Sequence, residues 1–196
     1  MYTQHKKRAK AYFDGRAENW DQDFFHPPSK LVTIADYCRI ASGQRILDAA
    51  CGTGMMTPAL LGTPAGQIKG IDISVKMIDR AKSKFKDSRL EYEMVDLYEF
   101  SETGWHVVLI FNAFPHLMDR SGLVGKLTEL LVPGGRFVVA HSQGPDSLNR
   151  LHEQKAGDIS FPLGPAEREA RIFEKAFTVD TLIDREDLYV ISGVLT

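Results

Sequence analysis

Residues 46–54 read Ile-Leu-Asp-Ala-Ala-Cys-Gly-Thr-Gly, and this stretch decides the fold. A short apolar run gives way to a carboxylate, Asp48, and then to a turn containing Gly52 and Gly54. Strands that lead into nucleotide-binding sites have this pattern. A nicotinamide cofactor, a nucleoside triphosphate and S-adenosylmethionine (SAM) are all compatible with it, so the neighbouring residues must discriminate between them.

The rest of the chain alternates segments with strand and helix patterns. Residues 4–41 have a helical pattern broken at Pro27-Pro28, and a hairpin of 178–183 and 188–194 closes the chain. The other predicted strands cover 45–48, 67–72, 90–95, 107–111 and 136–140, and the other predicted helices cover 55–62, 74–85, 121–131 and 165–176. This alternation predicts an α/β fold with a three-layer, doubly wound sheet.

Composition excludes several classes of function. The chain has 196 residues, a formal net charge of -2 and 43% hydrophobic residues, which predict one domain over residues 1–196 and no nucleic-acid partner. The basic cluster at 5–10 is interpreted as a solvated helix face. The spacing of Cys38 and Cys51 gives no disulfide framework or metal motif, and no apolar run approaches the roughly 20 residues of a membrane span. We therefore expect a cytoplasmic protein with no membrane partner.

The residues around the glycine turn separate the three ligands. A phosphate-binding loop needs a lysine after its last glycine, but Met55-Met56-Thr57 follows Gly54. The dinucleotide fingerprint needs a third glycine where Thr57 stands. Asp48 is badly placed for a pyrophosphate and well placed for an ammonium group, which SAM has in its amino acid moiety. Asp48 and Asp72 could each be turn carboxylates, but their joint spacing favours SAM.

Two further carboxylates follow the next strands. Asp72 ends the second strand, 18 residues beyond Gly54, where an acidic side chain accepts hydrogen bonds from ribose hydroxyls of NAD or SAM. Asp96 follows the third strand, where it can contact an adenine amino group.

Three motifs, at 47–54, 70–74 and 131–137, together resemble the class I SAM-dependent methyltransferases over about residues 10–195. The resemblance implies SAM as cofactor, a Rossmann-like core over 42–196, and seven strands of which the last is antiparallel. It also implies an N-terminal helical lid over 1–41, because 12–21 is similar to the family's aromatic lid. Ala50 replaces the usual first glycine of the turn, and His106 replaces a common Asp. The implied cofactor-binding residues are Tyr12, Trp20, Asp48, Ala50, Gly52, Gly54, Asp72, Ile73, Asp96, Leu97, Asn112 and Ala113.

The acceptor is predicted to be a small molecule. Residues 112–115 do not match the Asn/Asp-Pro-Pro-aromatic run of nucleic acid amino-methyltransferases, and no inserted domain is visible. Phe114-Pro-His116 and the run from His141-Ser142 to Asn149 and His152 resemble a set of bacterial class I methyltransferases of uncertain substrate.

Histidines in two loops are the candidates for contact with the acceptor. His116 and His141 are candidate catalytic bases, because imidazole titrates near working pH. His116, His141, Asn149 and His152 are candidate substrate-binding residues, with Asn149 and His152 on one face of a short helix. The histidines could instead hold a metal or a soft metal-like substrate, or His141 could cap its strand with His152 at the surface. We predict no metal site, and interpret His5, His26 and His106 as structural or exposed.

Two other classes of function remain open in the sequence: a nicotinamide oxidoreductase, which Thr57 and Asp48 disfavour, and a SAM-binding sensor or partner subunit without methyl transfer. Metalloid or thiol acceptors also remain alternatives. The pattern fixes neither the acceptor nor the oligomeric state, which we expect to be a monomer or homodimer.

Overall fold

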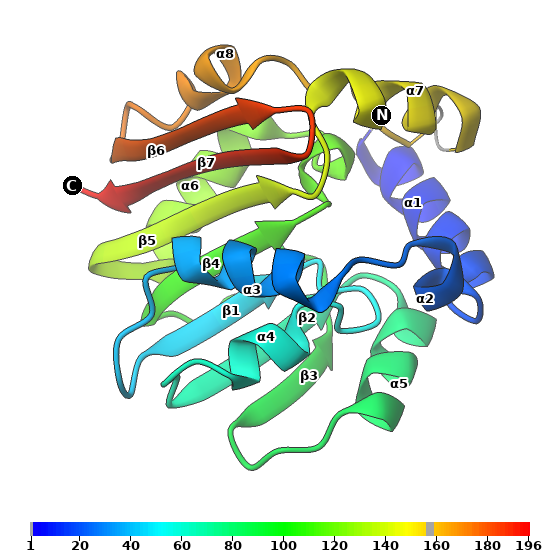
Figure 1. The fold of residues 1–196 in the computed structure, drawn as a ribbon, viewed down its shortest axis with the longest axis horizontal. Helices are drawn as coiled ribbons and strands as arrows, with labels where there is room; N and C mark the ends of the chain where they lie inside the picture. The colour runs from blue at the N-terminus through cyan, green and yellow to red at the C-terminus, as the bar shows by residue number, and fades with distance from the viewer. Residues whose placement is uncertain (1, 156–158) are drawn as a thin grey trace.

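The computed structural model describes residues 2–155 and 159–196, and its centre is one seven-stranded sheet (Figure 1). The strand order is β3-β2-β1-β4-β5-β7-β6. The strands are β1 (Arg45–Ala49), β2 (Gln67–Asp72), β3 (Leu90–Met94), β4 (Trp105–Phe111), β5 (Leu131–His141), β6 (Phe177–Arg185) and β7 (Leu188–Leu195). Strands β1 to β5 pair in parallel, and β7 runs antiparallel to both β5 and β6. The seven-stranded, doubly wound sheet with an antiparallel last strand is therefore confirmed.

Helices cover both faces of the sheet. They are α1 (Tyr2–Arg16), α2 (Trp20–Asp23), α3 (Pro28–Tyr37), α4 (Thr57–Leu61), α5 (Val75–Lys84), α6 (Arg120–Leu130), α7 (Pro145–Lys155) and α8 (Ala166–Ala170), with a 3-10 turn η1 (Phe114–His116). One apolar cluster joins Ile46 and Leu109 to α3 and α4, and another joins Leu47 and Val108 to α6 and α8. Because strand side chains alternate between faces, these two clusters give the three layers.

Two element boundaries differ from the sequence prediction. β5 begins at Leu131 rather than 136, because Leu131 pairs with Trp105 ahead of a register shift at the Pro133-Gly-Gly segment. Helix α8 ends at Ala170 instead of continuing to 176. The turn that follows leads Phe173 and Phe177 into the core beside Phe137.

The first 41 residues divide into two parts. Helix α3 packs on the sheet with Leu31 and Ile34 buried, so it belongs to the layer that it shares with α4. Helices α1 and α2 lie beside the carboxyl ends of the parallel strands (Figure 1). The segment that can act as a lid is therefore shorter than the predicted 1–41 and ends before α3.

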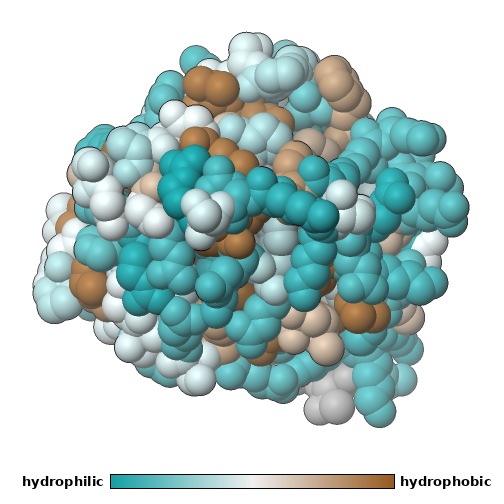
Figure 2. All heavy atoms as spheres, turned by 90° about the horizontal axis from the view of Figure 1, so that it is seen from below, coloured by the Kyte–Doolittle hydropathy of each residue, from teal (hydrophilic) through white to brown (hydrophobic). Residues whose placement is uncertain are grey.

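The β3 edge of the sheet carries charge. Glu91 and Glu93 on β3 form ion pairs with Lys69 of β2 at 3.6 and 3.2 Å. Seen from below the view of Figure 1, hydrophilic side chains cover most of the surface and hydrophobic atoms form small groups (Figure 2). Charged side chains on an edge strand oppose pairing with another sheet.

Candidate active site

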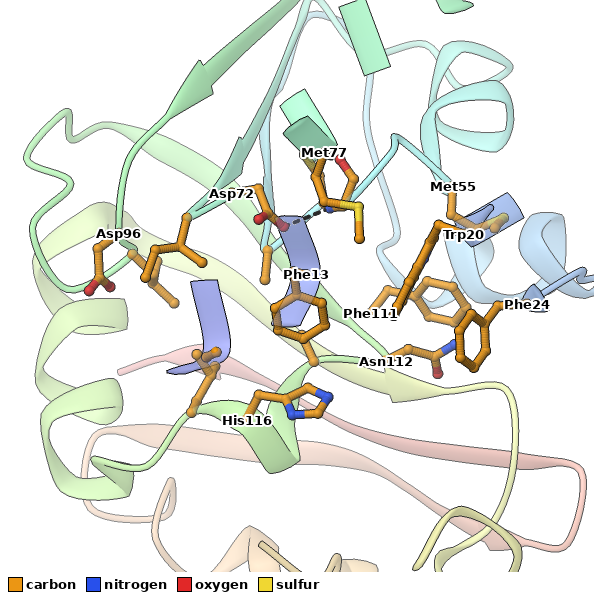
Figure 3. A pocket seen from close by; sticks show the side chains of 18 of the residues that line it. Phe13, Trp20, Phe24, Met55, Asp72, Met77, Asp96, Phe111, Asn112 and His116 are labelled. Carbon is orange, nitrogen blue, oxygen red and sulfur yellow. Dashed lines mark hydrogen bonds between the residues drawn. The ribbon is translucent and has the colours of Figure 1, made fainter. Parts of the chain in front are cut away.

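A pocket lies between the helices α1 and α2 and the carboxyl ends of β1, β2 and β4 (Figure 3). Asp96 and Asp72 lie on one side of it and Asn112 and Phe24 on the other, with Phe13 and His116 between them. The predicted cofactor-binding residues that line it are Trp20, Ala50, Gly52, Asp72, Ile73, Asp96, Leu97, Asn112 and Ala113. This end of a doubly wound sheet is where ligands bind.

The glycine turn uses left-handed backbone at three positions. Ala50 has φ +57°, Gly52 +55° and Gly54 +81°. Gly52 lines the pocket, and its backbone N–H donates to Asp72 Oδ2 at 2.9 Å. Gly54 is outside the lining, and a Cβ there would lie 2.7 Å from the hydroxyl of Tyr92. The two glycines therefore differ in purpose, because Gly52 shapes the pocket wall while Gly54 permits close packing behind it.

Substitution of Ala50 by glycine is expected to stabilise the protein. A non-glycine residue in the left-handed region costs roughly 1–2 kcal/mol. Glycine avoids this cost but loses more conformational entropy on folding, so the net gain in stability is smaller. We expect Ala50→Gly to raise the free energy of unfolding by about 1 kcal/mol in urea denaturation. The matched control is Ala49→Gly in β1, which should lower it by a similar amount. Equal losses in both variants would show that the Ala50 methyl contributes more by packing than its backbone costs.

Asp72 is held at the end of β2 by backbone donors. Its Oδ1 accepts from Ser74 N at 2.8 Å and its Oδ2 from Gly52 N, and the side chain is almost fully buried. Burial raises the pKa of Asp72 to about 6, against the opposing effect of these backbone hydrogen bonds. Each carboxylate oxygen has a second acceptor position, so Asp72 can take further hydrogen bonds from a ligand in the pocket.

Asp48 is buried beneath the turn and is not part of the pocket lining. Neither of its oxygens has a hydrogen-bond partner among the described residues. It follows Ile46 at a spacing of two, so its side chain lies on the α3 and α4 face of β1. Burial, and then the Asp72 carboxylate, raise the pKa of Asp48 to about 8. The predicted contact with an ammonium group stays a prediction, and this geometry does not place Asp48 in the wall.

The wall near Asp96 already contains a cation. Lys6 Nζ of α1 lies 2.8 Å from Asp96 Oδ2 and also pairs with Glu99. Asp96 Oδ1 accepts from Tyr98 N at 3.0 Å. The carboxylate predicted to contact adenine is thus partly neutralised by the lid helix.

Aromatic side chains of the lid cover the pocket. The rings of Trp20 and Phe24 lie 4.3 Å apart, and Phe13 lies 5.7 Å from Trp20. Phe13 and Phe24 line the pocket, although the sequence analysis did not select them. Tyr12 is outside the lining: its ring packs edge-on to Phe13 at 5.3 Å and under the guanidinium of Arg16. Phe13 therefore occupies the covering position that the sequence analysis predicted for Tyr12.

Polar contacts fasten this lid to the core. Asp14 Oδ1 accepts from Ser74 Oγ at 2.6 Å. Asp21 accepts from the hydroxyl of Thr53 in the glycine turn and pairs with Lys84 at 2.6 Å. The lid is therefore attached both to the turn and to the start and end of α5.

At the other end of the pocket, Asn112 joins three segments. Its φ is +52°, its Oδ1 accepts from Ser142 N at 3.0 Å, and its Nδ2 lies 3.2 Å from both Ser142 Oγ and His26 Nε2. His26 lines the pocket, packs edge-on to Phe111, and is half-buried. It was interpreted from sequence as structural or exposed, and no motif surrounds it that would have indicated otherwise.

His116 is the predicted catalytic residue that lines the pocket. Its ring lies edge-on beneath Phe13 at 5.2 Å (Figure 3). Nδ1 lies 3.1 Å from the carbonyl oxygen of Ile159 and 2.9 Å from Ser160 Oγ. A carbonyl only accepts, so Nδ1 carries the proton and Nε2 has the lone pair. Burial lowers the pKa of His116 to about 4, so the ring is neutral at pH 7.

The other three acceptor-site candidates lie outside the pocket lining. His141 is fully buried, and neither ring nitrogen has a partner among the described residues. His152 packs against His116 at a ring distance of 5.1 Å. Asn149 uses its side-chain amide to bind both backbone groups of Leu163, at 2.9 and 2.7 Å. The structure thus brings His152 and His116 together, whereas the Asn149 side chain holds the loop at Leu163 through two hydrogen bonds.

Residues 2–155 and 159–196 lack two features that the alternatives would need. They contain no group of three or more His, Cys, Asp or Glu side chains that could hold a metal ion. None of the helices in these ranges is both long enough and apolar enough to cross a membrane. The histidine-held metal alternative therefore has no supporting geometry among the described residues.

Comparisons with known proteins agree with this architecture. Residues 46–135 match a family model described as a methyltransferase domain. A malonyl-[acyl-carrier protein] O-methyltransferase of Acetivibrio thermocellus is 33% identical over 152 residues, which are 75% of this chain and 53% of that protein. The chain spans about half the length of the curated relatives it matches.

Solved structures share the fold at low identity. Magnesium protoporphyrin IX methyltransferase from Synechocystis, with bound S-adenosylhomocysteine (SAH), has a TM-score of 0.74 and 16% identity. The match covers 98% of this chain and 100% of the Synechocystis chain. Phosphoethanolamine N-methyltransferase 2 of Haemonchus contortus, with SAM, has a TM-score of 0.70 and 18% identity, covering 91% and 56%. The three motifs, the strand order and these matches together support a class I SAM-dependent methyltransferase.

Proposed function

We propose that this protein binds SAM in the pocket and transfers its methyl group to a small-molecule acceptor. The observation that carries the proposal is one continuous pocket, with the carboxylates Asp72 and Asp96 on one side and Asn112 with His26 on the other. The neutral imidazole of His116 lies between them. The aromatic lid spans the middle of this pocket. The relatives act on different acceptors, so their names support methyl transfer but do not choose the acceptor.

The residues present fit SAM better than a dinucleotide. Asp72 has spare acceptor positions for ribose hydroxyls, and Ile73 and Leu97 offer apolar surface for adenine. The rings of Phe13, Trp20 and Phe24 suit a sulfonium cation, because aromatic faces attract positive charge. Thr57 stands where a dinucleotide fingerprint has its third glycine, which disfavours a pyrophosphate. When bound, SAM supplies an electrophilic methyl group on sulfur.

The chain itself must orient the acceptor and exclude water. In-line placement of the reacting atoms accounts for most of the rate in a displacement of this kind. The lid attachments through Asp14 and Asp21 hold the aromatic cover closed, and the apolar side chains of Leu148 and Leu151 of α7 close the far wall. These side chains give the pocket a largely apolar wall that suits a small acceptor.

His116 is the residue proposed to receive the acceptor's proton. Its Nδ1 proton is fixed on Ile159, so Nε2 accepts a hydrogen bond from the acceptor. A hydroxyl oxygen becomes strongly acidic as it gains a methyl group, so an imidazole of low pKa can still take its proton. Because the pKa of His116 is about 4, we expect the ring to stay ready to accept a proton above about pH 5.

Thermal unfolding with candidate ligands tests the cofactor. A ligand at about 100 times its dissociation constant adds roughly 2.7 kcal/mol to the free energy of unfolding. We expect SAM and SAH to raise the unfolding temperature and NAD to leave it unchanged. A shift with NAD alone would overturn the proposal in favour of an oxidoreductase.

Methyl transfer is measured as SAH production with hydroxyl, amine and thiol acceptors. We expect turnover with at least one of them, and His116→Asn should reduce that turnover by about 100-fold while keeping the thermal shift with SAM. A protein that binds SAM but turns over no acceptor would instead be a sensor or a partner subunit.

A further inference from the structure

The acceptor end of the pocket is lined by imidazoles and contains no carboxylate. Around Asn112 and His116 the polar lining residues are His5, His26, Asn112, His116, Ser142 and Gln143. Lys6 is at the other end, where it pairs with Asp96. A cationic amine would find no opposite charge here, whereas hydrogen-bonding oxygen groups would find partners.

The hydrogen bonds around Asn112 fix the proton of His26. The backbone N–H of Ser142 donates to Asn112 Oδ1, so the amide nitrogen Nδ2 is the atom that faces His26. An amide NH₂ only donates, so His26 Nε2 must accept. The ring proton of the neutral histidine is therefore on Nδ1, which has no hydrogen-bond partner among the described residues.

Burial keeps His26 in this neutral form. Desolvation, and then the nearby Lys30 charge, lower the pKa of His26 below its usual range. The edge of the ring rests on Phe111 at 5.6 Å, which fixes its orientation from the β4 side. His26 is thus a fixed hydrogen-bond donor on the pocket wall.

His116 lines the same pocket and has the opposite polarity. Its Nδ1 donates to Ile159, which leaves the lone pair of Nε2 for a donor on the acceptor. Asn112 and His116 begin and end the short segment 112–116, so one segment positions both imidazoles. The two imidazoles of His26 and His116 thus offer one donor and one acceptor, and a separate hydrogen bond fixes the proton of each ring.

Resting on the proposed function, we infer that His26 is a specificity-determining residue. It donates its Nδ1–H to a second oxygen on the acceptor, while His116 receives the proton of the hydroxyl that is methylated. The class of acceptor is therefore a hydroxyl compound with a neighbouring hydrogen-bond-accepting oxygen, such as a catechol or a hydroxy-carbonyl compound. In the reaction the hydroxyl oxygen forms a bond to the methyl carbon, the carbon–sulfur bond breaks with its electron pair on sulfur, and the hydroxyl proton passes to His116 Nε2.

The position of the ring proton can be tested without turnover. Long-range ¹H–¹⁵N spectra of the imidazoles distinguish Nδ1–H from Nε2–H, with His26→Asn used to assign the signal. We expect the Nδ1–H form of His26 from pH 6 to 8, with or without SAH. Asn112→Asp replaces the donor by an acceptor and should move the proton to Nε2 or make the ring cationic. An Nε2–H form in the unmodified protein overturns the proposal.

Selectivity is tested by Trp fluorescence titration of the SAH-saturated protein with catechol, 2-hydroxyacetophenone and phenol. We expect at least one of the two-oxygen compounds to bind about tenfold or more tightly than phenol. His26→Leu should remove this preference, and His26→Asn should restore part of it because its amide nitrogen lies near the position of Nδ1. Equal binding of phenol, or a preference that survives in His26→Leu, overturns the inference.

Failure of the proposed function has a different signature. A protein that neither binds SAH nor produces it would refute methyl transfer, while the proton position of His26 could still be measured in the free protein. A protein that methylates amines but not the two-oxygen compounds would keep the proposed function and refute the acceptor class.

Discussion

Replacing Asp72 by alanine is expected to weaken SAM binding by at least about 100-fold. Hydrogen bonds to a charged partner contribute roughly 1.5–3 kcal/mol each, and Asp72 has positions for two ribose hydroxyls. The substitution also leaves the N–H groups of Gly52 and Ser74 without their acceptor, so the turn itself loses support. The measurement is isothermal titration with SAM, together with the thermal shift.

Two variants separate the lost contacts from general damage. Asp72→Asn keeps one carbonyl acceptor and should retain the fold with an intermediate loss of affinity. Asp79→Ala on the exposed side of α5 removes a carboxylate outside the pocket and should bind SAM like the unmodified protein. Unchanged affinity in Asp72→Ala would mean that the ribose lies elsewhere.

The affinity should also depend on pH through the same carboxyl. Its pKa of about 6 in the free protein means that the protonated form grows as the pH falls below 6. A protonated carboxyl accepts ribose hydrogen bonds less well, so SAM affinity should fall by up to about tenfold per pH unit below that point. Asp72→Asn should lack this dependence.

The sheet could be predicted from sequence because most of its parallel strands contain short apolar runs separated by helical patterns. Predicted strand 67–72 and the N-cap Ser74 agree with β2 and α5, since Ser74 Oγ accepts from Met77 N at 3.1 Å. The start of β5, before Pro133, was harder to predict. Leu131 pairs with Trp105, which is a tertiary contact that the local sequence pattern does not indicate.

The cofactor end of the site was also predictable, because motifs at strand ends fix it. The lid was only partly predictable. The sequence shows that the lid is aromatic, but it does not show which of the rings faces the pocket. Phe13 rather than Tyr12 lines the pocket because the facing is decided by the packing of α1 against the core. His26 was missed because its position depends on Asn112, 86 residues away.

Asp48 and His141 are buried outside the pocket lining, for a reason that the sequence did contain. Side chains along a strand alternate, so Asp48 lies on the same face as Ile46, and His141 on the same face as Phe137 and Val139. Both faces are covered by helices. Applying the period of two through the carboxyl end of each strand would have predicted these side chains to be buried beneath the site rather than within it.

The burial of His141 leads to the second large expected effect, a change in how stability depends on pH. Burial, and then the neighbouring His152, His116 and Arg120, lower the pKa of His141 to about 3. In the unfolded chain the pKa is about 6.5. As the pH falls below 6.5 the unfolded chain binds a proton that the folded protein rejects, so this residue lowers the free energy of unfolding by about 1.4 kcal/mol per pH unit. The loss continues until the pH approaches 3.

The total pH dependence conceals this contribution. Asp48 and Asp72 have raised pKa values in the folded protein, about 8 and about 6. Below those pH values the folded protein binds protons at these two carboxylates. The unfolded chain binds the same protons only when the pH approaches 4. Both carboxyls therefore stabilise the fold as the pH falls and offset His141 and His116. Only the difference between the unmodified protein and a variant isolates one residue.

His141→Leu is the variant to compare, because leucine has a similar volume and no polar atoms to leave unpaired. Urea unfolding at pH 7, 6 and 5 should show similar stability of the two proteins at pH 7. At pH 5 the stability of the variant relative to the unmodified protein should be about 2 kcal/mol higher than at pH 7. A structural His141 also predicts that methyl transfer survives in this variant. If SAM binding persists but transfer is lost by 100-fold or more, His141 reaches the reacting atoms after all, and the catalytic prediction made from its sequence position returns.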